Sequence, residues 1–162
     1  NSLSKTYSIT GWRLGYVCAP AYVMDRVRKV HDFLTVGAAA PLQEAVIAGL
    51  ELPDSYYQGV RDLFTHRKNI FCKGLDDIGL KYYEPQGTYF VMVDIGEFGY
   101  ESDYDFCIEL ARDVKVGAVP GSSFFKEPVN NYIRLHFAKS DETLHEALNN
   151  LSKIREIIKV KK

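Results

Sequence analysis

The sequence has little cysteine and no long hydrophobic run. Its three cysteines, Cys18, Cys72 and Cys107, are an odd number and show neither a disulfide framework nor the spacing of metal ligands. We therefore expect buried free thiols and no bound metal. No apolar run approaches the length of a membrane-spanning helix, and no signal peptide is recognisable. These absences predict a cytoplasmic protein without a membrane partner.

The sequence also lacks an excess of charge of either sign. It has 20 Lys and Arg against 21 Asp and Glu, which gives a formal net charge of -1 at pH 7. Such a balance argues against nucleic acid as a partner. What is present is a globular composition, with 46% hydrophobic and 13% aromatic residues. A chain of 162 residues with this composition can bury a core of ordinary size.

The residues that carry chemistry are concentrated at the start of the chain. Residues 2–15 read Ser-Leu-Ser-Lys-Thr-Tyr-Ser-Ile-Thr-Gly-Trp-Arg-Leu-Gly. Lys5 offers an amine that can bond covalently with a carbonyl. Arg13 offers a planar fork that, with nearby serine hydroxyls, can bind a phosphate ester. Capture of an aldehyde beside capture of a phosphate meets the two needs of pyridoxal 5'-phosphate.

The whole segment resembles the pyridoxal-phosphate attachment motif of the class I and II aminotransferases. That motif runs small, apolar, small, Lys, two free positions, small, apolar, free, Gly, free, Arg, apolar, Gly, and residues 2–15 satisfy each constrained position. Residues 10–16, Thr-Gly-Trp-Arg-Leu-Gly-Tyr, resemble the branch that holds many bacterial and archaeal aspartate aminotransferases and the kynurenine aminotransferases.

This resemblance implies roles for single residues. Lys5 would be the catalytic residue, which holds the cofactor and, once substrate displaces it, moves a proton at the substrate α-carbon. The implied cofactor-binding residues are Ser2, Ser4, Lys5 and Arg13. The residues that contact the cofactor ring in the family precede the lysine and have no counterpart in this chain.

A second stretch, residues 131–137, alternates apolar and polar side chains and predicts a strand with Arg134 facing away from the core. Residues 132–138, Tyr-Ile-Arg-Leu-His-Phe-Ala, resemble the family strand whose arginine receives the substrate α-carboxylate. A planar guanidinium can bind a carboxylate through two parallel hydrogen bonds, which a lysine cannot do. The resemblance therefore implies that Arg134 is the substrate-binding residue.

Hydrophobic periodicity and turn residues predict the elements. Helices are expected over about residues 22–34, 41–50, 54–78, 102–114 and 140–158, and strands over about 13–18, 81–83, 88–94, 116–119 and 131–137. The later elements form an α+β layer. By resemblance, the fold class is α/β, that of the fold-type I pyridoxal-phosphate-dependent transferases. Residues 1–52 would be the tail of the large cofactor-binding domain, and residues 53–162 the small C-terminal domain with a long interdomain helix over 54–78.

The expected function of the parent protein is pyridoxal-phosphate-dependent transfer of an amino group between an α-amino acid and a 2-oxo acid. The chain would be a C-terminal fragment, inactive when isolated, of a parent expected to be a homodimer. Two alternatives stay open: a pyridoxal-phosphate-dependent β-elimination lyase, and an aminotransferase-like sensory domain of a transcription regulator. Residues 37–40, Gly-Ala-Ala-Ala, lack the arginine that the classical aspartate-specific branch carries in this region, so the amino-acid specificity is left open.

Overall fold

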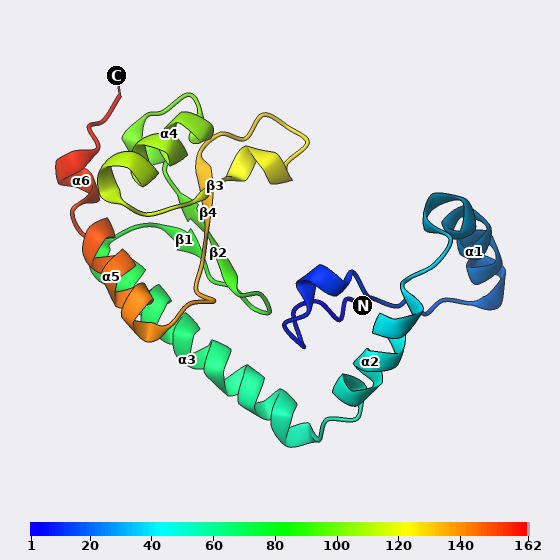
Figure 1. The fold of residues 1–162 in the computed structure, drawn as a ribbon. Coiled ribbons are helices and arrows are strands. Elements are labelled where there is room, and N and C mark those ends of the chain that lie inside the picture. Colours follow the sequence, from blue (N-terminus) through cyan, green and yellow to red (C-terminus); the bar gives the residue numbers. More distant parts are fainter. Residues whose placement is uncertain (162) are drawn as a thin grey trace. The chain divides into compact units, whose positions relative to one another are not determined.

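The computed structural model describes residues 1–161, which form two compact units that meet in the sequence between Val60 and Arg61 (Figure 1). Helix α3 (Asp54–Ile78) begins in the first unit and continues into the second. It has the predicted bounds and ends at Gly79, whose φ of 75° suits glycine at the end of a helix.

The first unit contains a loop followed by helices. A short 3-10 turn, η1 (Thr10–Trp12), lies in the loop, and helices α1 (Ala21–Thr35) and α2 (Ala40–Leu50) confirm the two predicted helices. Its core is small, because only Leu3, Leu14 and Val46 are buried together. Helix α1 buries no residue, and the exposed fractions on its predicted apolar side reach 59% at Val30 and 75% at Leu34.

The predicted strand over residues 13–18 is wrong. This segment forms a single antiparallel bridge, between Ser2 and Gly15, instead of a ladder. A strand needs a partner along its length, and here only residues 1–3 provide one, through bonds such as that from the Leu3 N–H to the Leu14 carbonyl.

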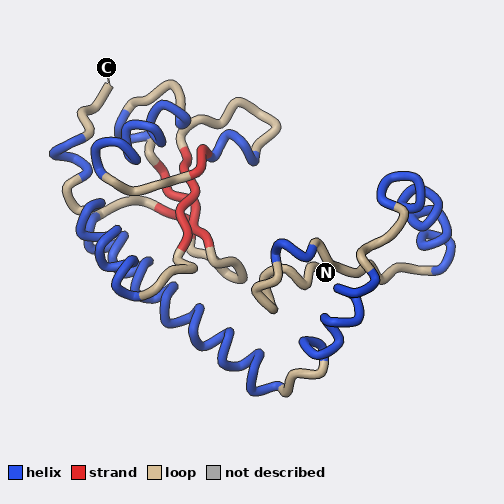
Figure 2. The backbone as a smooth tube through the Cα atoms, viewed as in Figure 1, coloured by secondary structure: helices blue, strands red, loops and turns tan. Residues whose placement is uncertain are grey.

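The second unit is built on a four-stranded antiparallel sheet of order β1-β2-β4-β3. The strands are red in Figure 2. The strands are β1 (Tyr82–Tyr83), β2 (Phe90–Asp94), β3 (Val119–Pro120) and β4 (Tyr132–His136). They lie within or beside the predicted strands. Strand β3 is shorter than predicted and includes Pro120, because it has only two partners on β4.

The two faces of this sheet differ in burial. Val91 and Val93 of β2 pair with Leu135 and Ile133 of β4, and all four are at most 3% exposed. They pack into the large core with side chains of α3, α4 (Asp103–Glu109) and α5 (Asp141–Leu151). The alternate residues, which include Arg134, lie on the other, less buried face, as expected from the two-residue period of strands.

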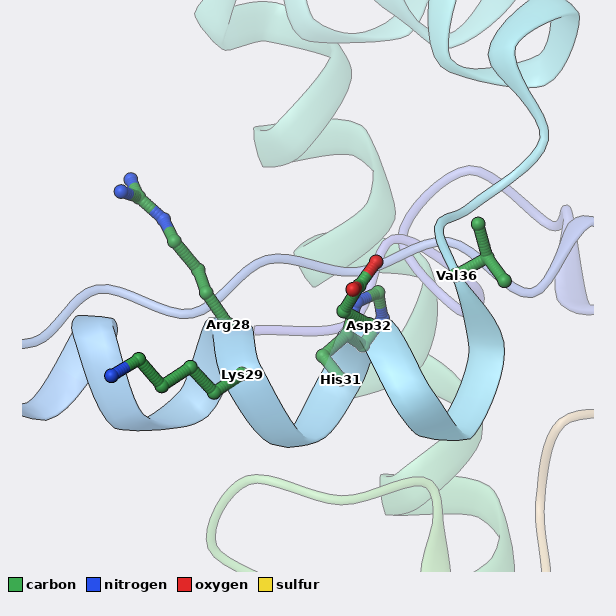
Figure 3. A pocket seen from close by; sticks show the side chains of 5 residues that line it. All are labelled: Arg28, Lys29, His31, Asp32 and Val36. Atoms are coloured by element: carbon green, nitrogen blue, oxygen red, sulfur yellow. The ribbon is translucent and has the colours of Figure 1, made fainter.

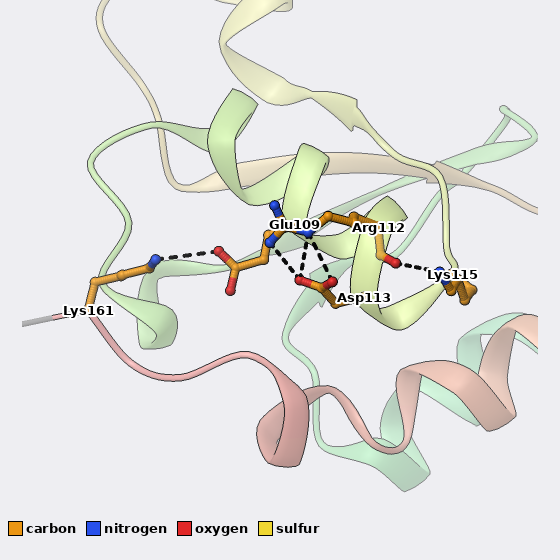
Figure 4. Close-up of polar contacts among 5 residues, drawn as sticks. All are labelled: Glu109, Arg112, Asp113, Lys115 and Lys161. Carbon is orange, nitrogen blue, oxygen red and sulfur yellow. Dashed lines mark hydrogen bonds and ion pairs between the residues drawn. The ribbon is translucent and has the colours of Figure 1, made fainter.

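The predicted helix over residues 102–114 is shorter and changes its winding. Helix α4 is followed by a π-helical turn, η3 (Leu110–Val114), which buries Leu110 and Val114. Polar contacts surround this turn (Figure 4): Arg112 forms an ion pair with Asp113, and Lys161 reaches Glu109 at 3.4 Å. The hydrogen bonds from Arg112 lower the pKa of the Asp113 carboxyl.

The predicted helix over residues 140–158 is interrupted. Helix α5 is capped by Ser140 as expected, but it ends at Leu151, and a separate turn, α6 (Ile154–Ile157), follows. The Ser152 hydroxyl donates to the Asn149 carbonyl at 2.8 Å. Such bonding of a side chain to the preceding turn competes with continuation of the helix. The break leaves Leu151 and Ile154 both buried in the core.

Candidate active site

The lysine loop is closed at its base by its own two ends. The bridge between Ser2 and Gly15 brings the start of the motif beside its end. A Cβ atom at Gly15 would lie 2.8 Å from the Asn1 carbonyl oxygen, so this approach requires glycine. The closure explains how Ser2 and Arg13, eleven positions apart in sequence, come to flank one loop.

Thr10 connects the two cationic residues of the loop. The Lys5 amine donates to the Thr10 hydroxyl at 3.4 Å, and the Arg13 guanidinium donates to the Thr10 carbonyl at 3.0 Å. Arg13 has a φ of 59°, a left-handed conformation that costs a residue with a Cβ free energy. Strain of this kind clusters at functional sites, and it is kept here at the residue expected to bind phosphate.

The serines of the loop differ in accessibility. Ser2 is exposed, and its hydroxyl accepts the backbone N–H of Ser4 at 3.3 Å. Ser4 is only 6% exposed. The loop therefore presents the Ser2 hydroxyl, the Lys5 amine and the Arg13 guanidinium on an accessible surface. This donor set fits an aldehyde that carries a phosphate ester.

Three tyrosines hold the backbone beside the lysine. The Tyr56 hydroxyl of α3 donates to the Thr6 carbonyl at 2.7 Å, and the hydroxyls of Tyr7 and Tyr57 lie 2.7 Å apart. The hydrogen bond with Tyr57 raises the pKa of Tyr7 to about 12. The Tyr7 ring also packs against Gly49 of α2. Both neighbouring helices therefore fix the segment that follows Lys5.

In the second unit, Arg134 lies in an aromatic setting. Its guanidinium carbon is 4.8 Å from the ring centre of Phe90 on β2 and 4.2 Å from that of Phe124 on the 3-10 turn η4 (Gly121–Phe124). Both distances allow cation–π attraction. None of the ion pairs among residues 1–161 includes Arg134. Its fork is therefore held by rings and remains available to a carboxylate.

Two of the three cysteines are buried, as expected. Cys72 and Cys107 are buried free thiols, but Cys18 is exposed, contrary to expectation. Desolvation, followed by the charge of Asp103, raises the pKa of the Cys107 thiol to about 11. Burial lowers the pKa of His136, and the charges of Lys139 and Arg134 add to this effect.

A shallow hollow on α1 contains none of the predicted site residues. It is lined by Arg28, Lys29, His31, Asp32 and Val36. The two basic side chains extend away from the side chains of His31 and Asp32 (Figure 3). Within residues 1–161, no group of three or more His, Cys, Asp or Glu side chains is arranged to hold a metal ion. No helix in that range is long and apolar enough to span a membrane.

Comparison with protein families shows the family to which the chain belongs. The family model for aminotransferase class I and II matches residues 1–151. The chain belongs to this family. The cofactor of class I and II aminotransferases is pyridoxal 5'-phosphate, in agreement with the attachment motif, so the family and cofactor predictions are confirmed.

Individual class I and II aminotransferases match nearly the whole chain. Methionine aminotransferase of Escherichia coli is 34% identical over 155 residues, which cover 95% of this chain and 40% of that protein. Aspartate aminotransferase of Thermotoga maritima is 34% identical over 151 residues, with 93% and 37% covered. The structure of N-succinyldiaminopimelate aminotransferase from Mycobacterium tuberculosis superposes with a TM-score of 0.83 at 34% identity, covering 93% of this chain and 40% of that chain.

These matches confirm the predicted fold class. They also show how much of the length of these aminotransferases the chain covers. The chain spans about two fifths of the length of these aminotransferases. Within it, the attachment motif predicts the loop residues, and the resemblance of residues 132–138 predicts Arg134. Neither gave a role to Thr10, although its bonds to Lys5 and Arg13 are local. The contacts of the α3 tyrosines with the loop, and of the two rings with Arg134, join segments far apart in the sequence.

Proposed function

We propose that the whole protein to which this chain belongs is a pyridoxal-phosphate-dependent aminotransferase, which transfers an amino group between an α-amino acid and a 2-oxo acid. The observation that carries the proposal is the closed loop in which Lys5, Ser2 and Arg13 are presented together. Support comes from relatives named as aminotransferases of methionine, aspartate and other amino compounds.

The loop residues divide the binding of the cofactor between them. Lys5 would hold it covalently, and Arg13 and Ser2 would hold its phosphate. Ser4, also expected to bind the cofactor, is only 6% exposed, so its hydroxyl is not among the accessible groups of the loop. When bound, pyridoxal phosphate supplies an electron sink for the bond that breaks at the substrate α-carbon. The amine of Lys5, once displaced by substrate, would take the proton from that carbon and deliver it to the carbon that Lys5 had occupied, which is the net proton movement of an amino-group transfer. Thr10 keeps the amine within the loop by its hydrogen bond.

Arg134 would bind the α-carboxylate of the substrate. Two parallel N–H groups of its fork match the two carboxylate oxygens, so the contact fixes orientation as well as position. The packing of Phe90 and Phe124 near the guanidinium supports this role, because the rings hold the charge without neutralising it.

The proposal extends to domains and partners. Residues 1–52 would belong to a large cofactor-binding domain and residues 53–162 to a small domain. The partners would be an amino acid and a 2-oxo acid, without nucleic acid or membrane, in a cytoplasmic homodimer. Neither of the alternatives, the β-elimination lyase and the sensory domain of a regulator, gains support from the family match or the named relatives.

The attachment residue can be tested without measuring turnover. Full-length protein is purified with pyridoxal phosphate and reduced with borohydride, and the modified lysine is located by peptide mass spectrometry. We expect the cofactor mass on Lys5 and loss of the visible cofactor absorbance in Lys5→Ala, because the covalent bond needs this amine. Lys29→Ala, which removes an exposed lysine of α1, serves as the control and should retain both signals. An adduct on a different lysine would overturn the assignment.

A further inference from the structure

The position of Phe124 beside Arg134 needs an explanation. Phe90, the other ring near the guanidinium, is fixed within strand β2. Phe124 instead ends a four-residue 3-10 turn and is 50% exposed. A half-exposed ring on so short a turn has little packing of its own. Its place 4.2 Å from the Arg134 guanidinium carbon therefore depends on what holds the turn.

Asp103 holds this turn from α4. Its carboxylate accepts the backbone N–H of Ser122 at 2.6 Å and the hydroxyl of Ser122 at 2.8 Å. Asp103 is only 2% exposed, and a buried carboxylate is costly unless hydrogen bonds satisfy it. An acidic residue in the first turn of a helix is ordinary, but here both oxygens reach a segment nineteen positions further along the chain.

The same turn is pressed against the strand that carries Arg134. A Cβ atom at Gly121 would lie 2.5 Å from the Tyr132 carbonyl oxygen, so only glycine permits this approach. Just before it, Pro120 pairs with Ile133 of β4. The turn is thus fixed on one side by Asp103 and on the other by β4, and Phe124 is left directly at the guanidinium.

We infer that Asp103 is a positioning residue for carboxylate binding: through its two bonds to Ser122 it keeps Phe124 packed against the Arg134 guanidinium. The inference rests on the proposed role of Arg134. A flexible arginine loses rotamer freedom when it binds a ligand, and a ring that restricts it beforehand reduces this loss. A cation–π contact uses none of the N–H donors of the fork, so orientation is gained without competition for the hydrogen bonds.

The first test measures the exposure of Arg134 without any substrate. Full-length holoenzyme is treated with phenylglyoxal, and modification of Arg134 is timed by peptide mass spectrometry. We expect Phe124→Leu, Ser122→Ala and Asp103→Asn each to speed modification by about threefold or more, since each releases the ring. Phe125→Leu is the matched control, because Phe125 contacts the ring of Tyr132 and not Arg134. Equal rates in wild type and all variants would overturn the inference.

The second test separates binding from chemistry. The best substrate of wild type among the twenty common amino acids is titrated against each variant. We expect Phe124→Leu and Asp103→Asn to raise KM by roughly threefold to thirtyfold with little change in kcat, and to be non-additive when combined. Phe124→Tyr, which keeps a ring, and Ser122→Thr, which keeps a hydroxyl, should restore KM. Fully additive effects of Phe124→Leu and Asp103→Asn would contradict action through the ring.

A third set of variants distinguishes failure of this inference from failure of the proposed function. If Arg134→Lys raises KM but Phe124→Leu and Ser122→Ala do not, Arg134 binds the carboxylate and the positioning role is wrong. If Arg134→Lys leaves KM unchanged, the proposed role of Arg134 fails, and the inference fails with it. Thermal unfolding of each variant shows whether it is folded. Ser122→Ala removes a single hydroxyl and keeps the test decisive if Asp103→Asn does not fold.

Discussion

Arg134 shows how a single side chain can be prepared for a ligand. It stands on β4, opposite Met92 of β2 and Val119 of β3, in the interior of the sheet. A residue on a central strand has a fixed backbone, so its side chain starts from a defined point. The neighbouring rings then restrict the guanidinium while leaving its charge unpaired within residues 1–161.

The first prediction at this scale is the response to Arg134→Lys in full-length protein. Lysine keeps the charge but loses the second hydrogen bond and the planar match to a carboxylate. A charge-assisted bond contributes about 1.5–3 kcal/mol, so kcat/KM should fall on the order of tenfold to a hundredfold. Amino-acid titration followed at the cofactor chromophore measures this. The absorbance before titration should not change, and equal kinetics in both proteins would make Arg134 only a structural residue.

The sequence predicts site residues most directly where the expected chemistry lies in one continuous segment. Lys5 and Arg13 lie in one uninterrupted motif, and Arg134 lies in a strand whose alternation is visible in the sequence. The contact of Phe124 with Arg134 was not predicted, because it depends on the bonds between Asp103 and Ser122. A contact created by two other segments leaves no periodic or local trace in the sequence.

At the scale of elements, helix α3 contributes to the lysine loop through its first two turns. Tyr56 donates to the Thr6 carbonyl, one position after Lys5, and Tyr57 bonds with Tyr7. These bonds span about fifty positions of sequence. The helix therefore does more than connect the two units, since its start fixes the backbone beside Lys5, the proposed attachment residue.

Tyr56→Phe should loosen this backbone without changing the ring packing. The Thr6 carbonyl loses a donor, and a hydrogen bond of this kind contributes about 0.5–1.5 kcal/mol. We expect cofactor affinity to weaken by roughly twofold to tenfold, as measured by dialysis and absorbance of the full-length protein. Tyr22→Phe is the control, because Tyr22 of α1 is 75% exposed. If both variants bind the cofactor equally, the tyrosines do not position the loop.

The elements also show where sequence periodicity fails. The helix predicted over about residues 54–78 has those bounds in the structure, since Gly79 ends it through its own backbone preference. The break after Leu151 was missed because Leu151, Ile154 and Ile158 keep helical spacing across it. Periodicity records which residues are buried. It does not show that the Ser152 hydroxyl donates a hydrogen bond to the Asn149 carbonyl.

At the scale of the whole molecule, the two units have cores of very different size. The core of the first unit has three buried hydrophobic residues, and that of the second has nineteen. Buried apolar area is the main source of stability. Taken separately, the first unit has far less of it to offset the entropy of ordering its chain.

This difference predicts two steps of unfolding for the isolated 162-residue chain. Trp12, the one tryptophan, packs against the small core and reports on the first unit. Its fluorescence should change at a urea midpoint at least about 1 M below the last transition seen by far-ultraviolet circular dichroism, which we assign to the second unit. Val91→Ala, in the large core, should shift only the second transition. Coincident midpoints with both probes would contradict separate unfolding.

The left-handed backbone at Arg13 lowers the stability of the fold at a residue that is proposed to bind the cofactor. A non-glycine residue in this conformation costs about 1–2 kcal/mol. Any procedure that optimises sequence for folding alone will favour glycine or asparagine at this position, and with either replacement the guanidinium disappears. Thermostabilised versions of the protein chosen without regard to the cofactor will therefore tend to lose the guanidinium proposed to bind phosphate first, while their fold improves.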